Sequence, residues 1–134
     1  MQKERFFKYK ECLITYSLHN TNSEFSYLTT FPLEGINKFC YIEQIETKEN
    51  FRNMGYAQQA LNKFIEKMKL NKIELILLTA VYDECYYSNP DKNGLFKLVN
   101  FYKKNGFIAK DSVFSNEDYI DMKLKISYWK GFLK

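Results

Sequence analysis

A six-residue loop, Arg52-Asn53-Met54-Gly55-Tyr56-Ala57, carries the residue types best placed to do chemistry in this sequence. Glycine lets a backbone turn sharply or approach a ligand closely. The first turn of a following helix leaves N–H groups without intrahelical partners, and the helix dipole adds partial positive charge there. A phosphate group can therefore bind at such a loop, with the guanidinium of Arg52 supplying a full charge. An ordinary strand-to-helix turn with a surface arginine has the same local pattern, so the flanking elements must decide.

The segments around this loop predict a strand, a helix and a second strand in succession. Residues 39–47 are aromatic and β-branched, which is typical of a strand. From Ala57 to Met68, apolar residues recur at three- and four-residue spacing, which predicts a helix with one buried face that ends near Asn71. The nearly continuous apolar run 73–81 predicts a strand buried on both faces. A crossover of this kind makes the two strands parallel neighbours.

The remaining elements complete a mixed sheet in one domain, residues 1–134. We expect two earlier strands, at 12–18 and 24–31, that form an antiparallel meander with 39–47. A second helix at 95–105 and a final pair of strands at 107–110 and 119–126 follow. In the last strand, Ile120, Met122, Leu124 and Ile126 alternate with Asp121, Lys123 and Lys125, which predicts one buried face. The fold class is therefore α/β with a mixed α+β sheet, in which the meander leads into a strand–helix–strand parallel pair.

Composition excludes several classes of protein. A chain of 134 residues with 46% hydrophobic and 27% charged residues can bury one core and is not a disordered chain. No run of about 18 apolar residues would span a membrane, and the charged N-terminal segment lacks the apolar core of a secretory signal. The net charge of +4 suits an anionic cofactor and is too small to indicate nucleic acid.

The cysteines predict free thiols. Cys12, Cys40 and Cys85 lack the paired spacing of a metal site, and His19, the single histidine, cannot complete one with them. We therefore expect no metal and a reducing, cytoplasmic environment.

In this order and spacing, the segments resemble the GNAT superfamily of acyl-CoA-dependent N-acyltransferases. The matching pieces are the strand ending Ile45-Glu46-Thr47, the Arg-x-x-Gly-x-Ala loop at 52–57, and the run Asn100-Phe101-Tyr102 followed by Asn105-Gly106-Phe107. The resemblance implies that the loop residues Arg52, Asn53, Met54, Gly55, Tyr56 and Ala57 hold the pyrophosphate of acetyl-CoA. It also implies that the strands 39–47 and 73–81 splay apart, so that the backbone from Ile45 to Thr47 pairs with the pantetheine arm.

Acyl transfer to an amine needs an acid for the departing thiolate. Tyr102 matches the position where the family often keeps a tyrosine for that purpose. Its alternative role is that of a core aromatic on a helix face, with its hydroxyl satisfied nearby. Many family members carry an asparagine seven residues earlier, where this chain has Leu95.

Two carboxylates on the strand before the loop are candidates for the base that deprotonates the amine, Glu43 and Glu46. Strand alternation places them on opposite faces unless a bulge intervenes, and Glu43 then shares its face with Tyr41 and Ile45. Alternatively, both are solvated strand carboxylates, and water or no residue acts as base.

The resemblance implies an N-acetyltransferase that transfers the acetyl group of acetyl-CoA to a primary amine directly, in a ternary complex. The alternative is a non-catalytic module of the same fold that binds CoA or a partner. The acceptor stays open between a small amine and a protein or peptide, and Asp83 and Glu84 are candidates for binding a cationic one. About ten residues precede the meander where the family commonly has a strand and two helices, so the resemblance implies a shortened wall of the acceptor site. We expect either a protein or peptide acceptor or a homodimer in which the tail, Tyr128 to Phe132, covers that side.

Overall fold

A computed structural model of the chain describes residues 4–21, 31–33, 35–47, 55–81, 92–109 and 119–126. These residues form one six-stranded mixed sheet and two helices, as the sequence predicts for the fold class. In chain order the elements are β1 (Arg5–Tyr9), β2 (Cys12–Asn20), β3 (Lys38–Thr47), α1 (Tyr56–Leu70), β4 (Leu75–Val81), α2 (Lys92–Lys104), β5 (Ile108–Ala109) and β6 (Tyr119–Lys125). The strand order in the sheet is β1-β2-β3-β4-β6-β5.

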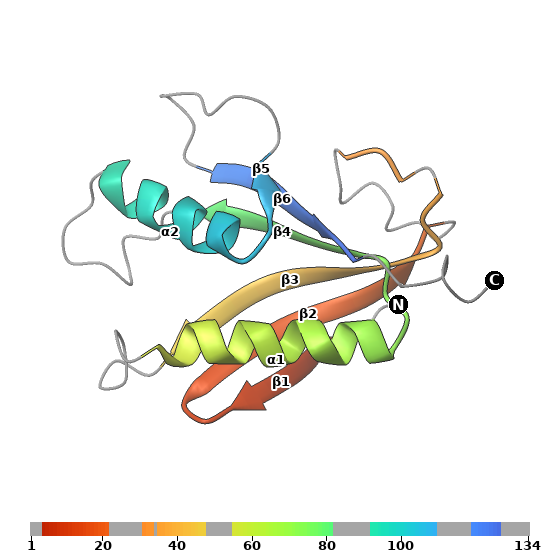
Figure 1. Ribbon diagram of the computed structural model, residues 1–134, viewed down its shortest axis with the longest axis horizontal. Coiled ribbons are helices and arrows are strands. Elements are labelled where there is room, and N and C mark those ends of the chain that lie inside the picture. Colours follow the sequence, from red (N-terminus) through yellow and green to blue (C-terminus); the bar gives the residue numbers. More distant parts are fainter. Residues whose placement is uncertain are drawn as a thin grey trace.

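Both helices pack against the same face of the sheet. Helix α1 crosses β1, β2 and β3, and α2 lies over β4 and β5 (Figure 1). The main core lies between these layers and contains side chains from both helices, including Phe64 of α1 and Val99 of α2. The opposite face carries a smaller apolar cluster, in which Phe39, Leu75 and Leu77 pack against the segment around Ile36.

The meander differs from the sequence prediction in its first members. Arg5–Tyr9 forms an unpredicted strand that pairs antiparallel with β2 through a two-residue turn. Its half-buried side chains, Phe7 and Tyr9, alternate with Phe6 and Lys8, and this pattern is easily missed in a short charged segment. The strand predicted at 24–31 lies outside the described residues except for Phe31, which is not in a strand. Strand β2 pairs directly with β3, so no other strand separates them.

Helix α1 follows its predicted periodicity. Its buried positions are Ala60, Leu61, Phe64 and Met68. The last helical residue is Leu70 and Asn71 is the C-cap, where the sequence predicts the stop; the next residue, Lys72, takes a positive φ of 61°. The N–H of Ile73 donates to the carbonyl of Met68, which closes the last turn in a Schellman arrangement with a lysine where glycine is usual.

The Asn105-Gly106 pair ends α2 in the same way. Gly106 has a φ of +96°, its N–H donates to the carbonyl of Lys103, and the N–H of Phe107 donates to the carbonyl of Tyr102. The rings of Tyr102 and Phe107 lie edge to face with centroids 5.6 Å apart, which is the apolar contact that accompanies this cap. The resemblance motif at this position is therefore also a helix stop. The predicted buried face of β6 is confirmed as well, since Ile120 and Met122 are buried and Leu124 is half-buried; Ile126, just after the strand, is buried too.

Candidate functional site

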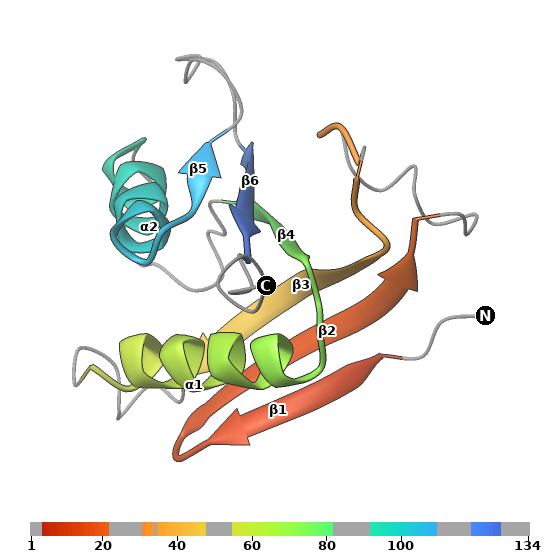
Figure 2. The same ribbon diagram turned by 45° about the vertical axis from the view of Figure 1, so that its right-hand side comes forward.

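The parallel pairing of β3 with β4 stops halfway along both strands. Its last pair is Ile42 with Leu78, although β3 continues to Thr47 and β4 to Val81. Beyond that pair the two strands diverge toward their carboxyl ends (Figures 1 and 2), while each keeps its other neighbour, β2 or β6. The backbone from Glu43 to Thr47 therefore meets no strand on its β4 side among the described residues. The splay implied by the resemblance is confirmed.

A β-bulge lies at the point where the gap opens. The register between β2 and β3 shifts so that Tyr16 opposes Ile42 and Thr15 opposes Gln44, which leaves Glu43 as the extra residue. The residues after it are moved to the other face of the sheet. Ile45, which opposes the core residue Ile14, therefore packs on the helix side.

The bulge corrects one prediction about the two candidate bases. Strict alternation would separate Glu43 from Glu46 and group Glu43 with Ile45. Because of the extra residue, Glu46 opposes Leu13 and shares with Tyr41 the face that is turned away from the helices. The carboxyl of Glu43 contacts that of Glu4, which lies one residue before β1 and in step with the exposed Phe6 and Lys8, so both candidate bases are on one side of the sheet.

Burial raises the pKa of the Glu43 carboxyl, and the negative charge and hydrogen bond of Glu4 raise it further. A carboxylate with a raised pKa is a stronger base than an ordinary one. The environment of Glu43 therefore favours the transfer of a proton to it.

The N-terminus of α1 lies beside the carboxyl end of β3. Gly55 is the N-cap residue with φ 80° and ψ 5°, a left-handed conformation that suits glycine. It offers no side-chain cap, and the first turn holds no acidic residue. The first-turn N–H groups precede the first helical donor, Gln59, and the helix dipole adds partial positive charge at this end. Arg52, Asn53 and Met54 lie outside the described residues.

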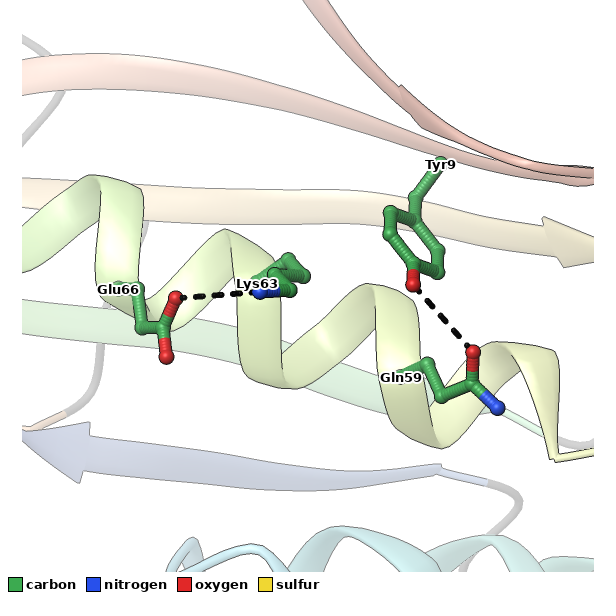
Figure 3. A network of polar contacts seen from close by, with 4 residues as sticks. All are labelled: Tyr9, Gln59, Lys63 and Glu66. Atoms are coloured by element: carbon green, nitrogen blue, oxygen red, sulfur yellow. Dashed lines mark hydrogen bonds and ion pairs between the residues drawn. The ribbon is translucent and has the colours of Figure 1, made fainter.

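One cation that sequence analysis missed lies at this helix end. Lys10, in the turn between β1 and β2, places its Nζ 3.3 Å from Gln59 Oε1 and 5.3 Å from the centre of the Tyr56 ring. The same glutamine accepts a hydrogen bond from the hydroxyl of Tyr9 at 3.4 Å, which ties the hairpin to α1 (Figure 3). Lys10 has a positive φ of 52°. Its proximity depends on the pairing of β1 with β2, so no local motif in the sequence indicates it.

Tyr102 is 7% exposed and lies in the core shared by both helices. Its ring also meets Phe101 edge to face, with centroids 5.3 Å apart. Asn105 holds this end of α2 to α1, because its side chain exchanges hydrogen bonds with Gln58. These contacts fix the position of the tyrosine, and its role as an acid stays a prediction.

The remaining candidates are two buried thiols and residues outside the described part of the chain. Cys12 and Cys40 are free and buried, and burial raises the pKa of both thiols, which leaves them poor nucleophiles. Asp83, Glu84, Cys85 and the tail from Tyr128 lie outside the described residues. No group of metal-ligating side chains occurs within the part of the chain that the structure describes. None of the described helices is long and apolar enough to cross a membrane.

A groove of about 520 Å³ lies away from the gap. Its lining comes from the second half of α1, the end of α2 and the end of β6, namely Asn62, Ile65, Glu66, Lys69, Asn105, Leu124, Lys125 and Ile126. None of the predicted site residues that the structure describes lines it.

Comparison with protein families gives a match between residues 17–107 and the acetyltransferase (GNAT) family. No match is found among the curated proteins. The match to the family covers β3 and β4, the two strands that diverge, together with α1 and α2.

Solved structures share the fold at low sequence identity. The NatC complex bound to Gag peptide and CoA is 17% identical, with a TM-score of 0.58 over 87% of this chain and 62% of that one. Arabidopsis thaliana Naa50 in complex with the bisubstrate analogue CoA-Ac-MVNAL is 16% identical, with a TM-score of 0.56 over 86% and 65%. Arabidopsis thaliana NAA60 in complex with acetyl-CoA is 13% identical, with a TM-score of 0.52 over 84% and 62%. This chain thus spans less than two thirds of each of these proteins.

Proposed function

The chain belongs to the GNAT acetyltransferase family, and from this premise we propose that it transfers the acetyl group of acetyl-CoA to a primary amine, directly and in a ternary complex. The observation that carries the proposal is the opening between β3 and β4 beyond Ile42 and Leu78, next to the N-terminus of α1. An open strand edge can pair with the amides of a pantetheine arm. A helix N-terminus can hold phosphates.

The cofactor is placed by two sets of groups. The backbone between Ile45 and Thr47 pairs with the pantetheine arm, and the loop from Arg52 to Ala57 holds the pyrophosphate. Lys10 adds a second positive charge at the same helix end, within reach of the first turn through its contacts with Tyr56 and Gln59. The absence of acidic residues from the first turn of α1 supports an anion site there.

The chemistry is divided between the two faces of the sheet. Tyr102, on the helix side, gives a proton to the departing thiolate. Glu43 and Glu46, on the opposite side, face the amine, which is cationic at neutral pH and is attracted by their charge. The raised pKa of Glu43 makes it the stronger candidate base of the two.

The acceptor in this proposal is a peptide or protein amine. Two of the solved structures with this fold hold a peptide or a peptide-linked analogue, the Gag peptide in NatC and CoA-Ac-MVNAL in Naa50. Small amines, and a homodimer that covers the acceptor side, are tested in the same experiment.

A second function, a module that binds CoA without turning it over, is favoured by one observation. Tyr102 is almost fully buried between aromatic rings, as expected for a purely structural residue.

The test measures free thiol released from acetyl-CoA with three acceptors: the pentapeptide MVNAL, a peptide with a blocked N-terminus and one lysine, and spermidine. We expect thiol release and a matching mass increase in a peptide. Stabilisation by acetyl-CoA on heating, without release with any acceptor, would instead support the binding module. Mass measurement in solution reports whether the active species is a dimer.

A further inference from the structure

A chain of hydrogen bonds between side chains crosses three strands where the gap opens. The hydroxyl of Tyr41 on β3 lies 3.1 Å from Oγ1 of Thr79 on β4. The hydroxyl of Thr79 donates to Oδ1 of Asp121 on β6 at 2.8 Å. Thr79 is the first residue of β4 after the last parallel pair, so these hydrogen bonds lie at the inner end of the gap. All three side chains are half-buried.

The direction of these hydrogen bonds follows from proton counting. A threonine hydroxyl has one proton, and Thr79 gives it to the carboxylate of Asp121. Tyr41 must therefore donate its own proton to Thr79. The oxygen of Tyr41 then has lone pairs left to accept a hydrogen bond from a ligand. The negative charge of Asp121, acting through the hydroxyl of Thr79, fixes the orientation of the Tyr41 hydroxyl.

The hydrogen-bonded side chains of Tyr41, Thr79 and Asp121 lie on the face of the sheet that the two helices leave uncovered. Leu75 and Leu77 share the face of Thr79 by strand alternation, and they pack in the apolar cluster opposite the helices, with Tyr41 against it. If the phosphates lie at the N-terminus of α1, the thioester enters the gap from the helix side. The amine must then attack from the side where Tyr41 lies.

We propose that Tyr41, Thr79 and Asp121 form the relay that removes a proton from the acceptor amine, an inference that rests on the proposed function. The ammonium N–H bond breaks as its proton passes to the oxygen of Tyr41. The proton of Tyr41 passes to Thr79, and that of Thr79 passes to Asp121, which becomes neutral. The freed lone pair forms the C–N bond as the C–S bond breaks. The sulfur takes the proton of Tyr102, which regains one from the nitrogen, and Asp121 returns its proton to solvent.

In this scheme Tyr41 is a catalytic residue, whereas Thr79 and Asp121 are positioning residues that act through it. In this scheme the relay takes the place of Glu43 as the base, and Glu43 and Glu46, on the same face, hold the cationic acceptor. Lys123, two residues along β6 from Asp121, extends toward the ring of Phe31, 5.1 Å from its centre, and stands outside the relay.

The test uses the full chain and the acceptor among MVNAL, the lysine peptide and spermidine that gives most product. Tyr41→Phe, Thr79→Val and Asp121→Asn each break one link with little change in side-chain volume. We expect kcat to fall by about 10²-fold or more in each, the usual contribution of a positioned acid or base, with KM for acetyl-CoA unchanged. Thr79→Ser keeps the hydroxyl and should restore most of kcat. Lys123→Gln removes a charge from the same face of the same strand and should leave kcat unchanged.

The outcomes separate the relay from its rivals. Variants that keep full kcat while Glu43→Gln abolishes it would overturn the relay and leave Glu43 as base. A loss of acetyl-CoA binding and of thermal stability in all three variants would show that these hydrogen bonds only stabilise the pairing of the three strands and would overturn the relay. A wild-type protein that acetylates none of the three acceptors would reject the proposed function itself, and the relay with it.

Discussion

Replacing Gly55 tests the cofactor site most directly, because the structure supplies a matched control. Gly55 and Gly35 both have a φ of +80°. Among the described residues, a Cβ added to Gly55 would meet only Gln59 Nε2 at 3.9 Å, and one added to Gly35 would meet nothing within 4 Å. Substitution at either position is therefore a problem of backbone conformation and not of steric block. For an L-residue the left-handed conformation costs about 1–2 kcal/mol.

We expect Gly55→Ala and Gly35→Ala to lower the free energy of unfolding by similar amounts, about 1 kcal/mol, since alanine also lowers the entropy of the unfolded chain. Only Gly55→Ala should weaken acetyl-CoA binding. If the backbone relaxes away from positive φ, the first-turn N–H groups turn away from the phosphates. The loss of one hydrogen bond to a charged group, about 1.5–3 kcal/mol, lowers affinity roughly ten- to hundredfold.

Urea unfolding measures the first effect, and titration calorimetry with acetyl-CoA measures the second. Gly55→Asn should recover much of both, because asparagine tolerates the left-handed region better than alanine. Equal affinity in the Gly55→Ala and Gly35→Ala proteins would refute the placement of the phosphates at this helix end.

The remaining predictions concern single side chains. Lys10→Gln should weaken acetyl-CoA binding by about tenfold, more at low than at high salt, and titrations at two ionic strengths check this; no change would remove Lys10 from the site. Tyr102→Phe should lower kcat by about 10²–10⁴-fold with acetyl-CoA affinity intact if its hydroxyl is the acid, and a loss of stability alone would support a core role. Phe64→Ala should cost about 3–5 kcal/mol in urea unfolding, because the ring is fully buried, and a cost under 1 kcal/mol would contradict the assigned core. Burial lowers the pKa of His19, so the stability it contributes is present above its unfolded pKa of about 6.5 and is lost as pH falls through the lower folded value. Wild-type stability should therefore drop between pH 7 and 5 more steeply than that of His19→Gln.

Much of the fold was predictable because the signals are local. The buried face of α1 follows from apolar residues at helical spacing, and the end of α2 follows from a glycine that can take positive φ next to Asn105. The alternation in β6 also comes directly from the order of residues along the strand. The superfamily followed from three such local segments in the right order, and the match over residues 17–107 confirms it.

Other features were decided only when strands met. The bulge at Glu43 exists because β2 and β3 pair in two registers on either side of it, and periodicity in one strand cannot reveal that. It places Glu43 and Glu46 on one face, where alternation alone had separated them. Lys10 reaches the N-terminus of α1 only through the β1 hairpin, 49 residues from Gln59 in sequence.

The hydrogen-bonded chain at the gap is the clearest case. Tyr41 and Thr79 are 38 residues apart, and Thr79 and Asp121 are 42 apart. A tyrosine, a threonine and an aspartate at such separations carry no signal in the sequence. They meet because β4 lies between β3 and β6, a strand order that depends on which apolar faces the folded chain buries together.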